Sequence, residues 1–110
     1  MKRTFIESTG FVKRVDQEGA GVLRAIQEEL LERPEAGSLM PGTGGLRKLR
    51  MPDSRRGKGK RGGFRVIYLD LADRERTYLL ALYDKDAKDD LEPEERKALR
   101  ALTARLKAEG

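Results

Sequence analysis

Apolar residues recur with two different periods along this chain, and each period predicts a different kind of element. In residues 19–33 an apolar side chain returns every fourth position, at Val22, Ile26 and Leu30. This spacing places the three side chains on one face of a helix, and the proline that follows marks its end. A shorter helix is predicted just before it, over the segment FVKRVDQ that begins at Phe11.

A third helix is predicted at the carboxyl end of the chain. Leu99, Leu102 and Leu106 would form its apolar stripe. Glu92 stands in the cap position and Pro93 in the first turn, and two further glutamates follow. Proline and acidic residues are favoured in the first turn of a helix, so the helix is predicted to begin here.

Alternation with a period of two predicts strands between the helices. In the segment FRVIYLDL, one side would hold Phe64, Val66, Tyr68 and Asp70, and the other Arg65, Ile67, Leu69 and Leu71. The segment Thr77–Asp84 is nearly all apolar, which predicts a central strand buried on both faces. Shorter strands are predicted over Arg3–Ser8 and Gly45–Met51.

The order of these elements is one strand, two helices, three strands and a helix. With 110 residues, of which 37% are hydrophobic, the chain is long enough for one modest core. We therefore predict a single α+β domain over residues 1–110. Its antiparallel-rich sheet would have about four strands, with two N-terminal helices and a C-terminal helix packed on one face.

The composition excludes several kinds of chemistry. The chain has no cysteine and no histidine, so it lacks disulfides, thiolates, the commonest general base and the commonest metal ligand. The segment MKRTFIESTG has no apolar stretch behind its charges, and no run approaches the roughly 18 apolar residues of a membrane span. We expect a cytoplasmic protein without a membrane partner, metal or cofactor.

Positive charge is concentrated in one segment of the chain. Between Arg47 and Arg65 there are nine cations and one acid, Asp53, a net charge of +8, whereas the whole chain has +5. The rest of the chain therefore sums to −3. Such a local field steers a polyanion to one face of a protein. The charge leaves open whether that polyanion is a nucleic acid or an acidic protein. The candidate binding residues are Arg47, Lys48, Arg50, Arg55, Arg56, Arg61 and Phe64, the last as a ring that could stack on a base.

The stretch RRGKGKRGGFR, residues 55–65, has two interpretations. It could be a solvated loop whose cations keep the protein soluble. However, its glycines allow backbone amides to approach phosphate oxygens, and Arg65 falls inside a predicted strand, where a fixed guanidinium would suit a phosphate. We therefore interpret it as part of a site. The acidic cluster Asp84, Asp86, Asp89 and Asp90 is interpreted as solvating the start of the last helix rather than as a site for a divalent ion.

The motifs GTGGLRK and GKGKRGG, with the strand GGFRVIY after them, resemble the RelE/HigB toxins of bacterial toxin–antitoxin systems, and most closely the HigB-type branch. The resemblance covers most of the chain. It implies a microbial-RNase-like fold and metal-independent cleavage of mRNA in the A site of the 70S ribosome. The RNA 2′-hydroxyl would be the nucleophile and a 2′,3′-cyclic phosphate the product. It also implies contacts with ribosomal RNA and a cognate antitoxin that silences the toxin.

The same resemblance suggests roles for individual residues. Arg65 matches the strand arginine that the family places near the scissile phosphate, and the basic segment just before it is matched by Lys58, Lys60 and Arg61. The chain departs from the family at the end of the last strand, where RelE has a further arginine and a tyrosine. Here the sequence YDKDAKDDL offers Tyr83 and Lys85 as substitutes. The candidate catalytic residues are Arg65, Lys58, Lys60, Tyr83 and Lys85.

Cleavage of RNA by its own 2′-hydroxyl requires alignment, stabilisation of charge on phosphorus and a proton for the leaving oxygen. Arginine and lysine stabilise the charge well but are poor bases. A site of this kind is expected to be slow on free RNA and to need the ribosome to orient its substrate. Two alternatives remain: a ParE-like toxin, which poisons DNA gyrase, and a non-catalytic RNA-binding module. The dense basic hairpin favours RNA over gyrase, and the sparse aromatic residues disfavour a simple binding module.

Overall fold

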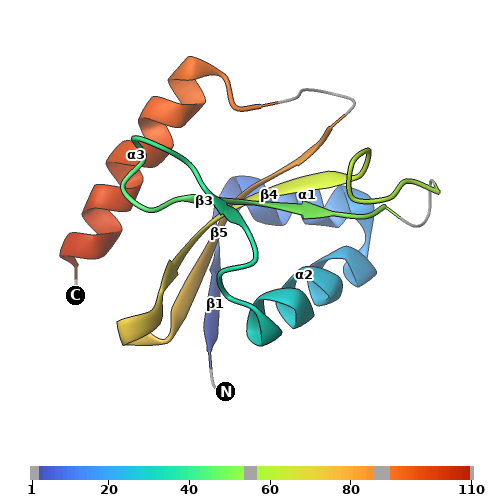
Figure 1. The fold of residues 1–110 in the computed structure, drawn as a ribbon, viewed down its shortest axis with the longest axis horizontal. Helices are drawn as coiled ribbons and strands as arrows, with labels where there is room; N and C mark the ends of the chain where they lie inside the picture. Colours follow the sequence, from blue (N-terminus) through green and yellow to red (C-terminus); the bar gives the residue numbers. More distant parts are fainter. Residues whose placement is uncertain (1–2, 54–56, 86–89, 110) are drawn as a thin grey trace.

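The computed structural model describes residues 3–53, 57–85 and 90–109, and Figure 1 shows their fold. In chain order the elements are β1 (Thr4–Glu7), α1 (Thr9–Glu18), α2 (Ala20–Glu32), β2 (Ser38–Leu39), β3 (Arg47–Met51), β4 (Phe64–Leu71), the 3-10 turn η2 (Ala72–Arg74), β5 (Arg76–Asp84) and α3 (Pro93–Ala108). Every helix and strand predicted from the periodicity is present.

The strands form one mixed sheet in the order β1-β5-β4-β3-β2. β1 is parallel to β5, and the other three pairings are antiparallel. The nearly all-apolar β5 therefore has a neighbour on each side, as predicted for a buried strand. The sheet has five strands rather than about four, because β2 has only two residues within a connector rich in glycine and proline, too few for any alternation to be recognised.

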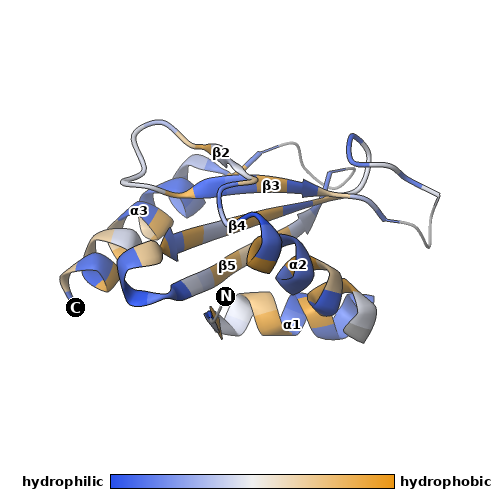
Figure 2. Cartoon of the chain, turned by 60° about the horizontal axis from the view of Figure 1, so that its bottom comes forward, coloured by the Kyte–Doolittle hydropathy of each residue, from blue (hydrophilic) through white to orange (hydrophobic). Residues whose placement is uncertain are grey.

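Two layers of core lie on the two faces of the sheet. Phe64, Val66 and Tyr68 of β4 pack with Phe11 of α1 and Ile26 of α2 in one cluster. The alternate β4 residues Ile67, Leu69 and Leu71 belong to the other, which the leucines of α3 cover. Figure 1 shows α3 across the sheet from α2, and Figure 2 shows α1 and α2 side by side.

The expectation that all helices pack on one face is therefore wrong. The central strands are apolar on both faces, so each face needs a helical layer to exclude water from it. The alternation within β4 was predicted correctly, and it places apolar side chains on both faces, one of which α3 covers.

Tyr68 anchors the connection between α2 and β2 from within the core. Its buried hydroxyl donates a hydrogen bond to the carbonyl oxygen of Pro34 (2.8 Å) and accepts one from the Gly37 N–H (2.9 Å). Burial raises the pKa of Tyr68, against the opposing effects of the Gly37 N–H and the nearby Arg47 charge. The hydroxyl is thus a neutral donor that supports the fold.

The start of α3 follows the prediction closely. Glu92 is its N-cap, Pro93 its first residue, and Glu92 and Glu95 form a reciprocal capping box. In the part of the chain that the structure describes, no helix is both long and apolar enough to cross a membrane.

Candidate nucleic-acid interface

The β3–β4 hairpin brings the basic segment to one end of the sheet. Two backbone hydrogen bonds between Asp53 and Lys58 hold the two sides of the hairpin together beyond the ends of β3 and β4. The N–H of Lys85 donates to the carbonyl of Gly63 (3.1 Å), which connects the end of β5 to the hairpin. Across the sheet, Arg50, Arg65 and Tyr83 stand in one row of paired positions. Three candidate residues that are distant in sequence thus become neighbours.

Arg65 lies inside the hairpin rather than on its surface. It is 4% exposed. One guanidinium nitrogen donates to the carbonyls of Lys60 (2.9 Å) and Phe64 (3.3 Å), and the other donates to the carbonyl of Arg61 (2.8 Å). The side chain therefore supplies hydrogen-bond donors to two carbonyls of the loop and to one at the start of β4. Its contact with a phosphate stays a prediction.

Gly63 allows the hairpin to close tightly. A Cβ atom at this position would lie 2.1 Å from the carbonyl oxygen of Met51 and 2.9 Å from the amide nitrogen of Asp53. Both neighbours are backbone atoms, which cannot rotate out of the way. The glycine is therefore required for close approach of two chain segments.

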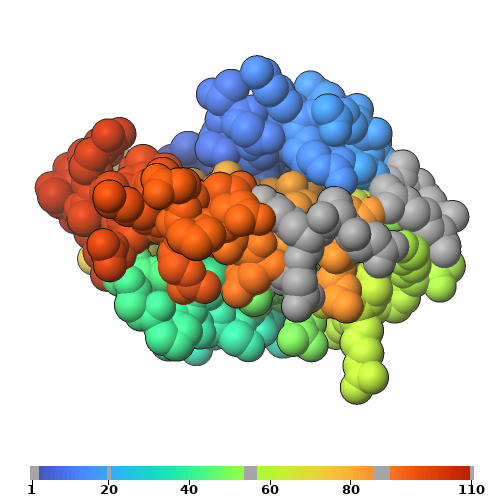
Figure 3. Space-filling view, turned by 90° about the horizontal axis from the view of Figure 1, so that it is seen from above, coloured from blue at the N-terminus to red at the C-terminus, as the bar shows by residue number. Residues whose placement is uncertain are grey.

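Most of the described cations of the hairpin loop face solvent, as does Lys85 just after β5. Lys60, Arg61 and Lys85 are exposed, and Lys58 is half-buried. Figure 3 shows the hairpin, in yellow-green, projecting from the body of the molecule. Because long cationic side chains in water remain available to a polyanion, these residues belong to the accessible part of the basic surface.

A polar groove of about 530 Å³ runs from the hairpin towards α2. Four cations line it: Arg33, Lys48, Arg50 and Lys60, together with Glu29, Ala36, Ser38 and Leu49. Arg33 was not among the predicted residues, because its pairing with Glu29 one turn earlier is the ordinary pattern of a helix surface. Only the folded chain brings it to the basic hairpin.

Two of the predicted cations on β3 already have protein partners. The guanidinium of Arg47 donates to the carbonyls of Glu35 (3.3 Å) and Gly37 (2.7 Å), so it holds the α2–β2 connection together with Tyr68. The ammonium of Lys48 lies 3.4 Å from a carboxylate oxygen of Asp90. Both residues remain partly exposed.

The two aromatic candidates are buried. Phe64 is 2% exposed and belongs to the core beneath α1 and α2. Its ring is therefore not available to stack on a base, and we assign it to the core. Tyr83 is 5% exposed and lines a pocket of about 360 Å³ between α1 and α3, with Arg14 and Glu95 at its edges. Its predicted role in catalysis stays a prediction.

Some predicted residues lie outside the described ranges. Arg55 and Arg56 are among them, as are Asp86 and Asp89 of the acidic cluster. Within the described ranges, no group of three or more acidic, histidine or cysteine side chains is close enough to hold a metal ion.

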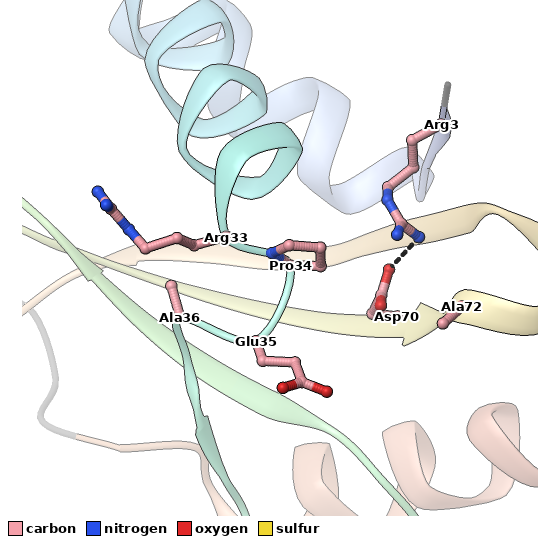
Figure 4. Close-up of a pocket in the computed structure, with 7 residues that line it drawn as sticks. All are labelled: Arg3, Arg33, Pro34, Glu35, Ala36, Asp70 and Ala72. Atoms are coloured by element: carbon pink, nitrogen blue, oxygen red, sulfur yellow. Dashed lines mark hydrogen bonds and ion pairs between the residues drawn. The ribbon is translucent and has the colours of Figure 1, made fainter. Parts of the chain in front are cut away.

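Another pocket, of about 470 Å³, lies at the far end of β4 from the hairpin (Figure 4). There Arg3 forms a buried ion pair with Asp70 (2.6 Å), and the hydroxyl of Thr77 donates to the same carboxylate (2.8 Å). Figure 4 shows the Arg3 side chain directed at Asp70, whereas Arg33 points away from it. The ion pair connects the residue before β1 to β4, so its role is structural.

Comparisons with known proteins agree with this fold. A family model described as "RelE toxin of RelE / RelB toxin-antitoxin system" matches residues 22–109. A structure of a double arginine-to-alanine mutant of the E. coli toxin RelE in the free state has a TM-score of 0.56 and 17% identity, over 81% of this chain and 90% of that chain. A crystal structure of the isolated E. coli RelE toxin has a TM-score of 0.56 and 15% identity, over 91% of this chain and 98% of that chain. At such identities these likenesses establish a shared fold, and the predicted α+β class is confirmed.

Proposed function

We propose that this protein, which belongs to the RelE family of toxins of toxin–antitoxin systems, cleaves mRNA in the A site of the ribosome and so inhibits translation. A cognate antitoxin would neutralise it, and both would act in the cytoplasm, where ribosomes are found. The observation that carries the proposal is the set of exposed cations on the hairpin and in its groove, at one end of an otherwise acidic chain.

The proposed reaction is an internal transfer of the phosphoryl group. The 2′-oxygen of the ribose forms a bond to phosphorus as the bond from phosphorus to the 5′-oxygen breaks. The 2′-hydroxyl gives up its proton to a water molecule, and the 5′-oxygen receives a proton from a cationic side chain. Lysine ammonium groups can donate that proton and stabilise the negative charge on phosphorus, and Lys58, Lys60 and Lys85 are the candidates near the Arg50–Arg65–Tyr83 row.

The hydrogen bonds of Arg65 favour a different role from the one that the family resemblance implies. A guanidinium that bonds three carbonyls cannot at the same time clamp a phosphate with those donors. We therefore propose that Arg65 positions the hairpin and acts through Lys60 and Arg61, whose carbonyls it holds. The accessible cations around it would contact the RNA.

The experiment that tests this function is primer extension on a defined mRNA, with and without programmed ribosomes. The free-RNA arm contains EDTA, so that metal-dependent contaminants are silent. The wild-type protein is compared with a Lys58→Ala/Lys60→Ala variant and with a Lys13→Ala/Arg24→Ala variant. The last pair removes the same charge from exposed positions on α1 and α2.

We expect cuts that appear only with ribosomes. The cleavage rate should fall at least tenfold in the Lys58→Ala/Lys60→Ala variant and stay unchanged in the control. A tenfold loss in rate corresponds to about 1.4 kcal/mol in the activation barrier. The absence of cuts in both arms would overturn the nuclease proposal. Inhibition of gyrase supercoiling by the same preparation would then support a ParE-like toxin. Ribosome or RNA binding without cuts would support the non-catalytic module.

A further inference from the structure

A second cluster of cations lies on α3, outside the basic segment of the sequence. Arg96, Lys97 and Arg100 line a pocket of about 230 Å³, together with Gly42 and Pro93. Lys97 and Arg100 are exposed, and Arg96 is half-buried. Among the described residues that line this pocket, none is acidic.

The glycine loop beside α3 is held in place and leaves its backbone open to a ligand. The hydroxyl of Thr43 donates to the carbonyl of Met40 (2.6 Å) and accepts from the N–H of Leu46 (3.1 Å), so a buried side chain fixes the turn. Gly42 has a φ of +72°, and no heavy atom lies within 4 Å of the place a Cβ would take. A guanidinium nitrogen of Arg96 lies 3.4 Å from the carbonyl of Pro41, which joins the helix to this loop.

One carboxylate links this cluster to the cations of β3. Asp90 lies 3.4 Å from the ammonium of Lys48 and 3.6 Å from the guanidinium of Arg96. Burial acts to raise the pKa of Asp90, but the N–H of Leu91 and the two cations outweigh burial, so its pKa is lowered. Asp90 is therefore ionised at neutral pH and offsets one of the two positive charges beside it.

We infer that the pocket of Arg96, Lys97, Arg100 and Gly42 binds a phosphate of the RNA backbone, so that the RNA-binding surface extends from the hairpin, through Lys48, onto α3. This inference rests on the proposed function, since it adds a second contact for the same RNA. Guanidinium groups pair with phosphate oxygens through directed N–H donors, and an open glycine backbone lets a phosphate approach closely.

The arrangement of the two basic regions favours RNA over an acidic polypeptide. Figure 3 shows the start of α3, in orange, and the hairpin, in yellow-green, on one face of the molecule. A nucleic acid carries a phosphate at every nucleotide, so one strand can occupy both regions at once, and each region adds a salt-sensitive contact. In an acidic segment of a protein, by contrast, the carboxylates are usually interrupted by uncharged residues.

The test measures the affinity of the protein for a fluorescein-labelled RNA stem-loop, by fluorescence anisotropy, at a series of salt concentrations. The Lys97→Ala/Arg100→Ala variant is compared with the wild-type protein and with the Lys13→Ala/Arg24→Ala control of equal charge. We expect the α3 variant to bind RNA about tenfold more weakly than the wild-type protein at low salt. The slope of log K against log salt should become less steep, by the amount expected for the loss of about two phosphate contacts relative to the control. Asp90→Asn, which removes the acid between the two regions, is expected to bind a few-fold more tightly.

Three outcomes separate this inference from the proposed function. Equal affinity and slope in the α3 variant and the control would overturn the inference, whether or not Lys58→Ala/Lys60→Ala weakens binding. If, in that case, Lys58→Ala/Lys60→Ala still weakens binding, the surface ends at the β3–β4 hairpin, and the proposed function is not affected. If the α3 variant loses affinity for labelled poly-glutamate but keeps its affinity for the RNA stem-loop, the pocket recognises an acidic polypeptide and the RNA assignment is wrong.

Discussion

The strand residues and the loop residues of the basic hairpin carry the same charge but use it differently. Arg65 in β4 and Arg47 in β3 give their donors to backbone carbonyls of neighbouring loops. Lys60 and Arg61 are exposed, and only their backbone carbonyls meet the guanidinium of Arg65. Within one basic segment, Arg47 and Arg65 therefore support the shape of the surface, whereas the loop cations, with Lys48 and Arg50 of β3, are the ones that can meet a ligand.

This difference matters because charge in a sequence does not reveal where a side chain ends. A buried guanidinium must be hydrogen-bonded, and the nearest acceptors in a hairpin are its own carbonyls. An exposed ammonium needs no protein partner. Substitutions in the two groups should therefore separate into effects on stability and effects on binding.

The largest effect is expected from Gly63→Ala, which tests whether the hairpin depends on close backbone packing. The added methyl would meet the Met51 carbonyl at 2.1 Å, so the strands must move apart. We expect a loss of about 3 kcal/mol or more in the free energy of unfolding, measured by urea denaturation. Gly59→Ala is the control, because no atom lies within 4 Å of its added Cβ. Equal stability of the two variants would contradict the packing argument.

A smaller loss of stability is expected from Arg65→Ala. It removes the hydrogen bonds to the carbonyls of Lys60, Phe64 and Arg61 and a buried side chain, and should cost about 2 kcal/mol in the free energy of unfolding. Arg61→Ala removes an exposed cation from the same loop and serves as the control. If Arg65→Ala keeps wild-type stability and yet loses all cleavage, Arg65 acts on the phosphate directly, as the family resemblance implies, and the positioning role is wrong.

The smallest effect on stability is expected from Lys60→Ala, which probes the exposed group. The free energy of unfolding should change by less than about 0.5 kcal/mol, because the side chain is exposed. The affinity for RNA should fall, with the salt slope reduced by about one contact. Lys60→Arg keeps the charge and should retain both properties. A destabilisation of Lys60→Ala as large as that of Arg65→Ala would remove the distinction between the two groups.

Much of the fold follows from local patterns. The four-residue spacing of α2, the alternation of β4 and the capping sequence of α3 each predict their element, because side-chain periodicity is set by the geometry of the backbone itself. The location of the basic hairpin at one end of the sheet follows as well, since a turn between antiparallel strands must lie at their ends.

The candidate site was less predictable. Phe64 and Arg65 stand beside exposed cations in the sequence, yet both are buried. Arg33 and the α3 cations reach basic surfaces only because separate segments pack together. No local signal marks such residues, because burial depends on what covers a position.

By itself, the sequence determined the kinds and order of the elements, the buried central strand, the local concentration of positive charge and the likeness to RelE toxins. Only the tertiary structure decided that α3 covers the face opposite α1 and α2, that Arg65 is enclosed by its own hairpin, and that Gly42 lines one pocket with Arg96 and Arg100. The physical reason is the range of the interactions. Periodicity and capping act over a few residues, whereas burial and the meeting of distant cations arise only when the whole chain packs around both faces of its sheet.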